Sequence, residues 1–499
     1  MTLLSLKKVS LKIDQANILN QISFDLMSGE IFGLIGESGC GKSLTASSII
    51  GLLPEDSKLT GEIILNKVNL IGRTEKEMNA IRGTEISIVF QEPMKALNPL
   101  KTIKNQVLES ILVHSSSRKK DAENLAIEKL KLVGLNPSRI SPNRFPHELS
   151  GGQRQRVMIA IAIAKQPKLL IADEPTTALD VTTQSQILKL LQEIVKSEEM
   201  ALLIISHDLA VISNLADRVA IMKNGKIVDQ GKTEVVFTQL SQPYTKQILF
   251  DSFKVTKHPL VVGKNPLLDL RSVTKAYKTK FSLQFQNKKV PETVLNGVDF
   301  TLYTGECLGL VGESGCGKST LARSIMGLET LNSGTITIDK LPIKPGHKSL
   351  KNFRQKLQIV FQDPYGSFNP RHRIQRIIVE PLYLKKSTLN STEKIHLARK
   401  VITDVGLDIS DLSKFPHQFS GGQRQRIAIA RAIIIRPKLI ILDEALSALD
   451  VSLRNKMIHL LQELSINYDL SYLFISHDIE LVRSITNRVL IMNKGQIVE

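Results

Sequence analysis

The sequence predicts an α/β protein built from two tandem domains of the same design. The octapeptide GESGCGKS occurs twice, at residues 36–43 and 312–319, and each copy lies between a short apolar run and a helix-like segment. Strand-like and helical patterns alternate in the same order through both halves, which is typical of α/β domains. A length of 499 residues is sufficient for two domains with cores of their own. We interpret the chain as one module written twice.

Both octapeptides fit the phosphate-binding P-loop pattern, G-x-x-x-x-G-K-[ST]. Glycines let backbone N–H groups approach a triphosphate, the lysine adds a cation for the β- and γ-phosphates, and the serine hydroxyl can ligate Mg²⁺. A buried strand is predicted at residues 31–35 and a helix at 44–52, with its N-terminus toward the phosphates. A surface turn is the alternative, against which the order strand, loop, helix argues. The candidate nucleotide-binding residues are Gly36, Glu37, Ser38, Gly39, Cys40, Gly41, Lys42, Ser43, Gly312, Glu313, Ser314, Gly315, Cys316, Gly317, Lys318 and Ser319.

The other elements of the first half follow from local patterns. Strands are predicted at residues 3–13, 18–26, 61–65, 86–90, 168–172 and 201–206. Residues 91–99 are expected to form a loop because they contain two prolines and an Asn-Pro pair. Residues 102–135 and 157–164 have helical patterns, and residues 219–228 indicate a hairpin on an Asn-Gly turn.

Polar motifs stand at the ends of these elements and recur in the second half. A glutamine follows one strand, an Asp-Glu pair and a histidine each end another, and Ser-Gly-Gly-Gln begins an apolar helix, where it can bind an anion. For an isolated glutamine or histidine, a hydrogen-bonded core or loop group is the alternative. The two sets are Gln91, Ser150, Gly151, Gly152, Gln153, Asp173, Glu174 and His207, and Gln362, Ser420, Gly421, Gly422, Gln423, Asp443, Glu444 and His477.

Composition limits the possible classes of protein. Three cysteines cannot make a disulfide framework, and their use suits a reducing cytoplasm. The longest apolar runs fall short of the ~20 residues that span a bilayer, and the N-terminus does not resemble a secretory signal. The net charge of +18 permits either an anionic partner or simply solvated basic faces.

Taken in order, the two sets of motifs resemble the ATPase module of ABC transporters. The resemblance covers nearly the whole chain and implies ATP and Mg²⁺ as ligands. It also implies two P-loop NTPase domains of ABC type, each with a RecA-like core, an antiparallel β subdomain and a helical subdomain. We expect the first domain with a short tail at residues 1–250, a linker at 251–266 and the second domain at 267–499.

The resemblance also implies residue roles. Glu174 and Glu444 would polarise the attacking water, with His207 and His477 at the γ-phosphate. The Mg²⁺ set would be Ser43, Gln91, Asp173, Ser319, Gln362 and Asp443. Each Ser-Gly-Gly-Gln motif would complete the nucleotide site of the other half, through pairing of the two domains within the chain. Tyr277 would stack on adenine, whereas the matching first-half residue is Ile13.

The segment QDPYGSFNP at residues 362–370, the Phe-Pro-His runs at 145–147 and 415–417, and the tail at 242–249 resemble the dipeptide, oligopeptide and nickel branch of importers. This branch implies two permease subunits, a solute-binding protein, and a peripheral place on the cytoplasmic face of the inner membrane. Peptides are the first candidate solute, followed by nickel or a metal chelate. No nucleic acid is expected as a partner.

The sequence departs from this importer branch in two respects, and two other functions are alternatives to import. The branch often carries cysteines after the tail and uses two separate ATPase chains, whereas this chain has no cysteines there and the modules are fused. One alternative is a soluble tandem ABC ATPase that acts on ribosomes or nucleic acid, and the other is a P-loop kinase or GTPase. Cys40 and Cys316, next to a lysine and a helix N-terminus, are expected to be reactive thiols.

Overall fold

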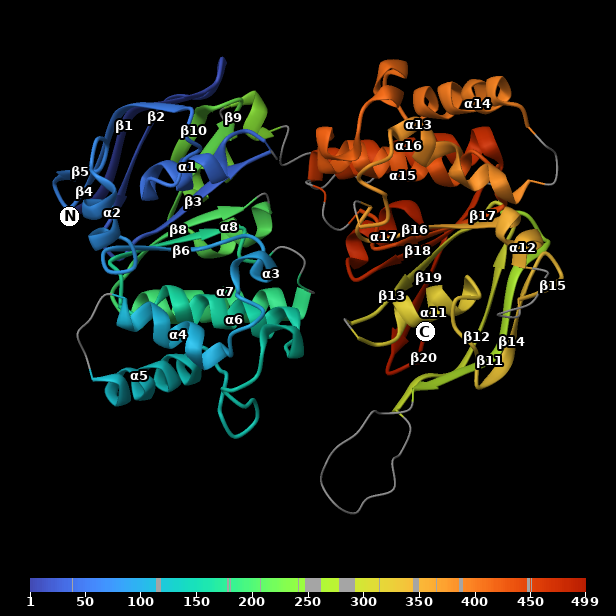
Figure 1. The fold of residues 1–499 in the computed structure, drawn as a ribbon, viewed down its shortest axis with the longest axis horizontal. Coiled ribbons are helices and arrows are strands. Elements are labelled where there is room, and N and C mark those ends of the chain that lie inside the picture. Colours follow the sequence, from blue (N-terminus) through green and yellow to red (C-terminus); the bar gives the residue numbers. More distant parts are fainter. Residues whose placement is uncertain are drawn as a thin grey trace. The chain divides into compact units, whose positions relative to one another are not determined.

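The computed structural model describes residues 1–37, 39–113, 118–176, 179, 181–206, 208–240, 242–246, 262–277, 292–313, 315–343, 350–364, 366–385, 389–446, 449 and 451–499. Internal contacts divide the chain into two units near residue 254 (Figure 1). Each unit is considered by itself. Most of the predicted linker, residues 251–261, lies outside the described residues, and the predicted domain limits stay predictions.

A small antiparallel sheet opens the first unit. Its strand order is β2-β1-β4-β5. Its strands are β1 (Thr2–Ile13), β2 (Ala16–Met27), β4 (Ser57–Leu65) and β5 (Val68–Asn69). In β2 the buried residues alternate with exposed ones from Ile22 to Leu26, so one face of this sheet is apolar and must be covered.

The second sheet of this unit carries the P-loop and is parallel except for one edge strand. Its order is β10-β9-β3-β8-β7-β6, and only the β9–β10 pair is antiparallel. The strands are β3 (Ile31–Gly36), β6 (Ile86–Val89), β7 (Leu169–Asp173), β8 (Ala201–Ser206), β9 (Arg218–Lys223) and β10 (Lys226–Lys232). Central strands such as β7 and β8 are buried throughout, because helices or the other sheet cover both faces.

Side chains of the central strands alternate between two cores. Leu169 and Ile171 of β7 belong to the core that is shared with the small sheet and α1, whereas Leu170 and Ala172 belong to the core formed with α4 to α8. The helices are α1 (Lys42–Ile50), α2 (Glu75–Ile81), α3 (Pro93–Ala96), α4 (Ile103–Leu112), α5 (Lys119–Leu132), α6 (Gly151–Ala162), α7 (Val181–Ser197), α8 (Leu209–Leu215) and α9 (Thr233–Gln239), with a 3-10 turn η1 (Pro146–Glu148).

The second unit repeats this plan. Its two sheets have the orders β12-β11-β14-β15 and β16-β17-β18-β13-β19-β20. The strands are β11 (Pro266–Tyr277), β12 (Glu292–Tyr303), β13 (Cys307–Val311), β14 (Ser333–Ile338), β15 (Leu341–Pro342), β16 (Leu357–Val360), β17 (Leu439–Asp443), β18 (Ser471–Ser476), β19 (Arg488–Asn493) and β20 (Gln496–Ile497). The helices are α11 (Lys318–Ile325), α12 (Leu350–Lys356), α13 (Ile374–Val379), α14 (Ser391–Asp404), α15 (Gly421–Ile433), α16 (Val451–Tyr468) and α17 (Ile479–Ile485), with 3-10 turns η2 (Glu380–Leu384), η3 (Ile409–Ser413) and η4 (Pro416–Gln418).

The prediction of two α/β domains, each with a P-loop core sheet, an antiparallel sheet and a set of helices, is confirmed. The hairpin at residues 219–228 is also confirmed, and its turn residues Asn224 and Gly225 have positive φ values of 46° and 75°, as a tight hairpin turn requires. The expected loop at residues 91–99 is wrong in part, because Pro93 begins the short helix α3. None of the helices in the described ranges is long and apolar enough to cross a bilayer.

Candidate functional site

Each P-loop connects the end of a central strand to the start of a helix. Gly41 and Gly317 precede the helices α1 and α11 with φ values of 106° and 112°, which favour glycine. At Gly36 and Gly312, a Cβ atom would lie only 2.3 Å from the carbonyl oxygen of a methionine in the neighbouring strand. The loops therefore need glycine at these positions for their backbone path. Ser38 and Ser314 lie outside the described residues.

The two P-loop lysines lie inside their own loops. Lys42 Nζ donates hydrogen bonds to the carbonyl oxygens of Gly36 at 2.8 Å and Glu37 at 2.9 Å. Lys318 Nζ makes the same bonds to Gly312 at 2.6 Å and Glu313 at 2.8 Å. Both side chains are only 5% exposed. A buried cation beside a helix N-terminus creates a site suited to a polyphosphate.

A hydroxyl and a carboxylate meet next to each lysine. Ser43 Oγ donates to Asp173 Oδ1 at 3.1 Å, and both Asp173 and Asp443 are buried at the ends of their strands. Burial raises the pKa of Asp173, and burial together with the neighbouring Glu444 raises the pKa of Asp443.

These oxygens fit a divalent cation. Oδ1 of Asp443 is buried and has no hydrogen-bond partner among the residues that the structure describes, and a buried carboxylate oxygen without a partner is costly. Carboxylate and hydroxyl oxygens are the ligands that Mg²⁺ prefers, and it takes only one or two of them from a protein when phosphates supply the others. The Ser43–Asp173 pair offers the same donor types in the first half.

The glutamates after these aspartates have an unusual backbone. Glu174 and Glu444 have φ values of 48° and 49°, in the left-handed region that costs energy for residues other than glycine and that often marks functional sites. Their N–H groups donate to the carbonyl oxygens of Ile205 and Ile475, each at 2.9 Å. A backbone bond to the neighbouring strand thus holds each glutamate in this conformation, a feature that the sequence patterns did not reveal.

Each glutamate meets the glutamine of its own half. Gln91 Nε2 donates to Glu174 Oε2 at 2.6 Å, and Gln362 Nε2 donates to Glu444 Oε2 at 2.7 Å. In the second half, His477 Nδ1 lies 3.4 Å from Glu444 Oε1. The hydrogen bond and charge of His477 lower the pKa of Glu444, so this carboxylate is ionised at neutral pH. His207 lies outside the described residues.

The Ser-Gly-Gly-Gln motifs form helix caps. Ser150 Oγ accepts from the N–H of Gln153 while the side chain of Gln153 accepts from the N–H of Ser150, and Ser420 and Gln423 make the same capping box. Both motifs therefore place a serine and two glycines at the N-terminus of a helix of at least twelve residues, α6 or α15. Such an end is suited to an anion.

Tyr277 ends β11 at the position that Ile13 occupies at the end of β1. The tyrosine is 36% exposed, and Lys275 Nζ lies 4.9 Å from its ring centre. Partial burial and a hydrogen bond to Glu329 raise the pKa of Tyr277, and a hydrogen bond with Thr320 opposes this rise. Since Thr320 follows the P-loop serine, the aromatic ring lies beside the start of α11. Ile13 instead packs against the core of the first unit.

The expectation of reactive P-loop thiols is wrong for Cys40. Its side chain is buried, and burial raises the pKa of its thiol. A Cβ atom at Gly36 would lie 2.7 Å from Cys40 Sγ, and one at Gly312 would lie 2.7 Å from Cys316 Sγ. Both sulfur atoms therefore pack against the first glycine of their own loop, and both cysteines are buried.

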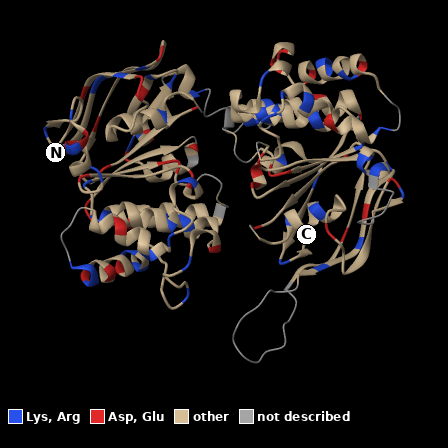
Figure 2. Cartoon of the chain, in the orientation of Figure 1, with Lys and Arg blue, Asp and Glu red and all other residues tan. Residues whose placement is uncertain are grey.

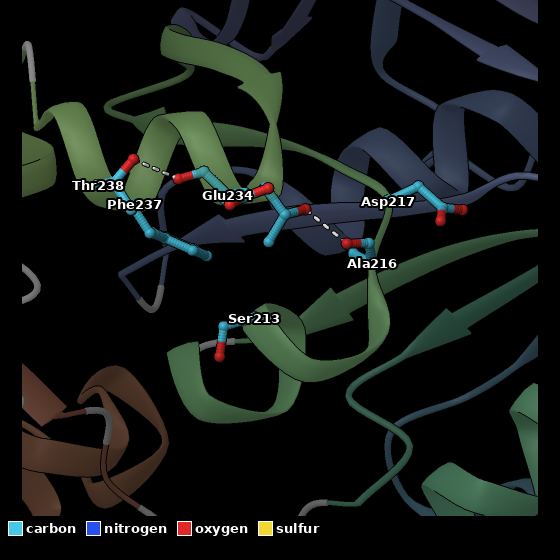
Figure 3. Close-up of a pocket in the computed structure, with 7 residues that line it drawn as sticks. Ser213, Ala216, Asp217, Glu234, Phe237 and Thr238 are labelled. Atoms are coloured by element: carbon cyan, nitrogen blue, oxygen red, sulfur yellow. Dashed lines mark hydrogen bonds between the residues drawn. The ribbon is translucent and has the colours of Figure 1, made fainter.

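A separate pocket lies between α8 and α9 (Figure 3). It has a volume of about 380 Å³ and is lined by Ser213, Ala216, Asp217, Thr233, Glu234, Phe237 and Thr238. Thr233 Oγ1 donates to the carbonyl of Ala216 at 2.6 Å, and Thr238 Oγ1 donates to that of Glu234 at 2.7 Å. The pocket shares no residue with the predicted nucleotide sites.

Comparison with known proteins gives consistent results. The chain matches the ABC transporter family over residues 19–177 and 295–447. It is 41% identical to the peptidoglycan transport ATP-binding protein YejF of Agrobacterium fabrum, with 100% of this chain and 92% of the relative covered. It is also 41% identical to the uncharacterized ABC transporter ATP-binding protein YejF of Escherichia coli K12, with 97% and 91% covered.

A third relative is the glutathione import ATP-binding protein GsiA of Escherichia coli K12. The two sequences are 38% identical, with 97% of this chain and 84% of the relative covered. These alignments run through both P-loop units. The chain therefore belongs to the ABC transporter family, as an ATP-binding protein with two ATPase modules whose ATP hydrolysis is coupled to transport.

Proposed function

We propose that the chain energises a membrane importer for peptide-containing solutes and that each half binds one ATP with Mg²⁺. The observation that carries this proposal is the recurrence of one constellation in both halves. A buried lysine, a serine next to an aspartate, and a glutamate bound by a glutamine surround the start of α1 and again of α11. Two independent copies of the same geometry indicate one chemistry performed twice.

Within each site the residues have distinct roles. Lys42 and Lys318 bind the β- and γ-phosphates, and the P-loop N–H groups surround them. Ser43 with Asp173, and Ser319 with Asp443, would hold Mg²⁺, assisted by Gln91 and Gln362. The ion would supply positive charge against the phosphate oxygens. Tyr277 stacks on the adenine of the second site.

Glu174 and Glu444 are the proposed catalytic bases. The carboxylate of Glu444 is ionised and so has a lone pair that can accept a proton from water, while Gln362 and His477 contact its two oxygens. The water oxygen then attacks the γ-phosphorus as the bond to the ADP oxygen breaks. Gln91 and Gln362 contact these bases directly, so a movement of either glutamine loop changes the position of the base.

The serine and glycines at residues 420–422 are proposed to face the ATP that is held by Lys42, and those at residues 150–152 the ATP that is held by Lys318. Each half alone then lacks part of both sites. Residues 1–262 and 263–499, expressed separately and together, test this proposal. We expect each half to hydrolyse ATP slowly as a monomer. Full turnover from a strictly monomeric half would contradict the proposed exchange of motifs.

The proposed partners are two permease subunits and a solute-binding protein, with this chain at the cytoplasmic face of the membrane. The names of the relatives refer to transport of peptidoglycan and import of glutathione, which is a tripeptide. They favour peptides over nickel or a metal chelate, and transport over an action on ribosomes. Lysine and arginine are interspersed with acidic residues over both units (Figure 2), rather than gathered as nucleic-acid-binding proteins often have them.

Reconstitution tests this function. The chain, its permease subunits and the binding protein are placed in liposomes, and ATP hydrolysis is measured with glutathione, other short peptides or Ni²⁺ outside. We expect short peptides to stimulate hydrolysis and to accumulate inside. Stimulation by Ni²⁺ alone would replace the peptide assignment. Sedimentation of the chain with ribosomes, in place of membranes that hold the permease, would replace the transport assignment.

A further inference from the structure

A half-buried arginine connects the glutamine loop of the second half to the signature helix α15. Arg431 lies in the last turn of α15. Its Nη1 donates to the carbonyl oxygen of Ser367 at 3.0 Å, and its Nη2 donates to Ser367 Oγ at 3.1 Å. The guanidinium also lies 5.1 Å from the ring centre of the buried Phe368. One side chain thus binds backbone, hydroxyl and aromatic groups of a single turn.

The surroundings make this contact specific. Burial lowers the pKa of Arg431, while the charge of Glu380 in η2 opposes that shift. Desolvating a guanidinium is costly unless its hydrogen bonds are satisfied in good geometry. The planar fork of arginine meets that condition with Ser367, whereas a lysine ammonium would not reproduce both bonds.

The bound turn leads directly to the catalytic glutamate. Ser367 Oγ donates to the carbonyl oxygen of Pro364 at 2.7 Å, and Ser367 N donates to the same oxygen at 3.2 Å. Gln362 precedes this turn and contacts Glu444 at 2.7 Å. Arg431 is therefore linked to Glu444 through its hydrogen bonds to Ser367, the hydrogen bonds of Ser367 to Pro364, the chain from Pro364 back to Gln362, and the bond from Gln362 to Glu444.

The first half has no equivalent of this tie. The residues at the matching positions are Ile161, Ala96 and Leu97. In this half the segment forms the helix α3, in which Leu97 N donates to the carbonyl of Pro93 at 2.9 Å and Ala96 N to that of Glu92 at 3.2 Å. Backbone bonds, apolar contacts and the side chain of Gln106 in α4, which bonds to the backbone of Asn98, hold the first glutamine loop. A charged contact from a helix distant in sequence holds the second.

We propose that Arg431 is a positioning residue for ATP hydrolysis in the second half. Its hydrogen bonds fix the turn after Gln362 to α15, the helix whose N-terminus carries residues 420–423. Gln362 therefore contacts Glu444 only when α15 is in the position that the structure shows. This role rests on the proposed function of Glu444 as base. Because Ile161 cannot make the contact, the two halves differ in how strictly signature-helix position controls the base.

Substitutions in the full chain test the proposal. Arg431→Lys keeps the positive charge but removes the planar guanidinium that donates both hydrogen bonds to Ser367. A triple variant, Ser367→Ala with Phe368→Leu and Arg431→Ile, introduces the apolar side chains that the first half packs at these positions. Ser367→Ala alone removes only one of the two hydrogen bonds. Ile161→Leu is the matched control in the first half. Steady-state ATP hydrolysis gives kcat and KM, and thermal unfolding checks the fold.

In a Glu174→Gln background, in which only the second site is expected to turn over, Arg431→Lys and the triple variant should lower kcat about three- to tenfold while KM for ATP stays within about twofold. Ser367→Ala should have a smaller effect, and Ile161→Leu none. Amide hydrogen exchange should become faster across residues 362–373 and stay unchanged across residues 91–102. The triple variant covers the case in which Arg431→Lys fails to fold, since the matching leucine and isoleucine, Leu97 and Ile161, already belong to one core in the first half.

Two results would overturn the proposal. One is full kcat in both Arg431→Lys and the triple variant. The other is a loss of activity that follows only the fraction of unfolded protein, which would make Arg431 purely structural. The Glu174→Gln, Glu444→Gln variant distinguishes failure of the proposed bases from failure of the positioning role. If that chain stays active, the proposed base is wrong. If it is inactive while the Arg431 variants are fully active, only the positioning role fails.

Discussion

Replacing both proposed bases, Glu174→Gln together with Glu444→Gln, should stop ATP turnover without preventing ATP binding. Glutamine has nearly the same shape as glutamate, and its carbonyl oxygen can still accept from the side chains of Gln91 and Gln362, which now donate at 2.6 and 2.7 Å. The change should therefore lower the free energy of unfolding by no more than about 1 kcal/mol at each site. An amide cannot accept the proton of the attacking water, and loss of a general base lowers the rate by about 10²–10⁴.

The assay measures phosphate release and, separately, titration with a fluorescent ATP analogue. The matched control is Glu193→Gln with Glu463→Gln, two exposed carboxylates on the equivalent helices α7 and α16. The control should hydrolyse ATP at the original rate. Turnover of the Glu174→Gln, Glu444→Gln chain within about twofold of the control would refute the assignment, because general-base catalysis contributes far more than that.

Three further outcomes are expected. Tyr277→Leu should weaken ATP binding at one site about two- to tenfold, the range of an aromatic stacking contact, whereas Ile13→Leu should leave ATP affinity unchanged; titration of the hydrolysis-deficient chain measures both. Cys40 should react with maleimide more slowly than a free thiol, with or without MgATP, as mass spectrometry of labelled protein can check. Lys356 and Lys438 lower the pKa of Asp339, so its stabilising effect is present above the unfolded-state pKa near 4 and is lost as pH falls through the folded-state value. Asp339→Asn should therefore reduce stability at pH 7 by at most about 1 kcal/mol, and the difference from the original chain should shrink in denaturant titrations below about pH 4.

Much of each site was predictable because its backbone conformation requires particular residue types at fixed spacings. The glycines and lysine of a P-loop have few other uses in that order, and the apolar runs on either side predict the strand and helix that orient them. The Asp-Glu pairs were predictable as the ends of buried strands. Their ligands and roles were inferred from the resemblance and stay proposals.

Other features depend on contacts that no local pattern encodes. The positive φ values of Glu174 and Glu444 are imposed by bonds to the neighbouring strands, at Ile205 and Ile475. The error about Cys40 has a similar cause. Its position beside a lysine in the sequence suggested a low pKa, but the side chain packs under Gly36, and desolvation outweighs the nearby charge.

The two glutamine loops differ in structure although they belong to duplicated modules. Their sequences align without a gap and the first was expected to be a loop, yet it contains the helix α3, whereas the second contains a turn bound by Arg431. The deciding residue is 64 positions away from Ser367 in the chain. A local pattern shows only which backbone groups a segment can pair within itself. Arg431, on a helix distant in sequence, donates two hydrogen bonds to a turn that is not helical. Equal motifs in the two halves therefore specify the same chemistry, while the residues that hold those motifs in place differ and can give each ATP site a control of its own.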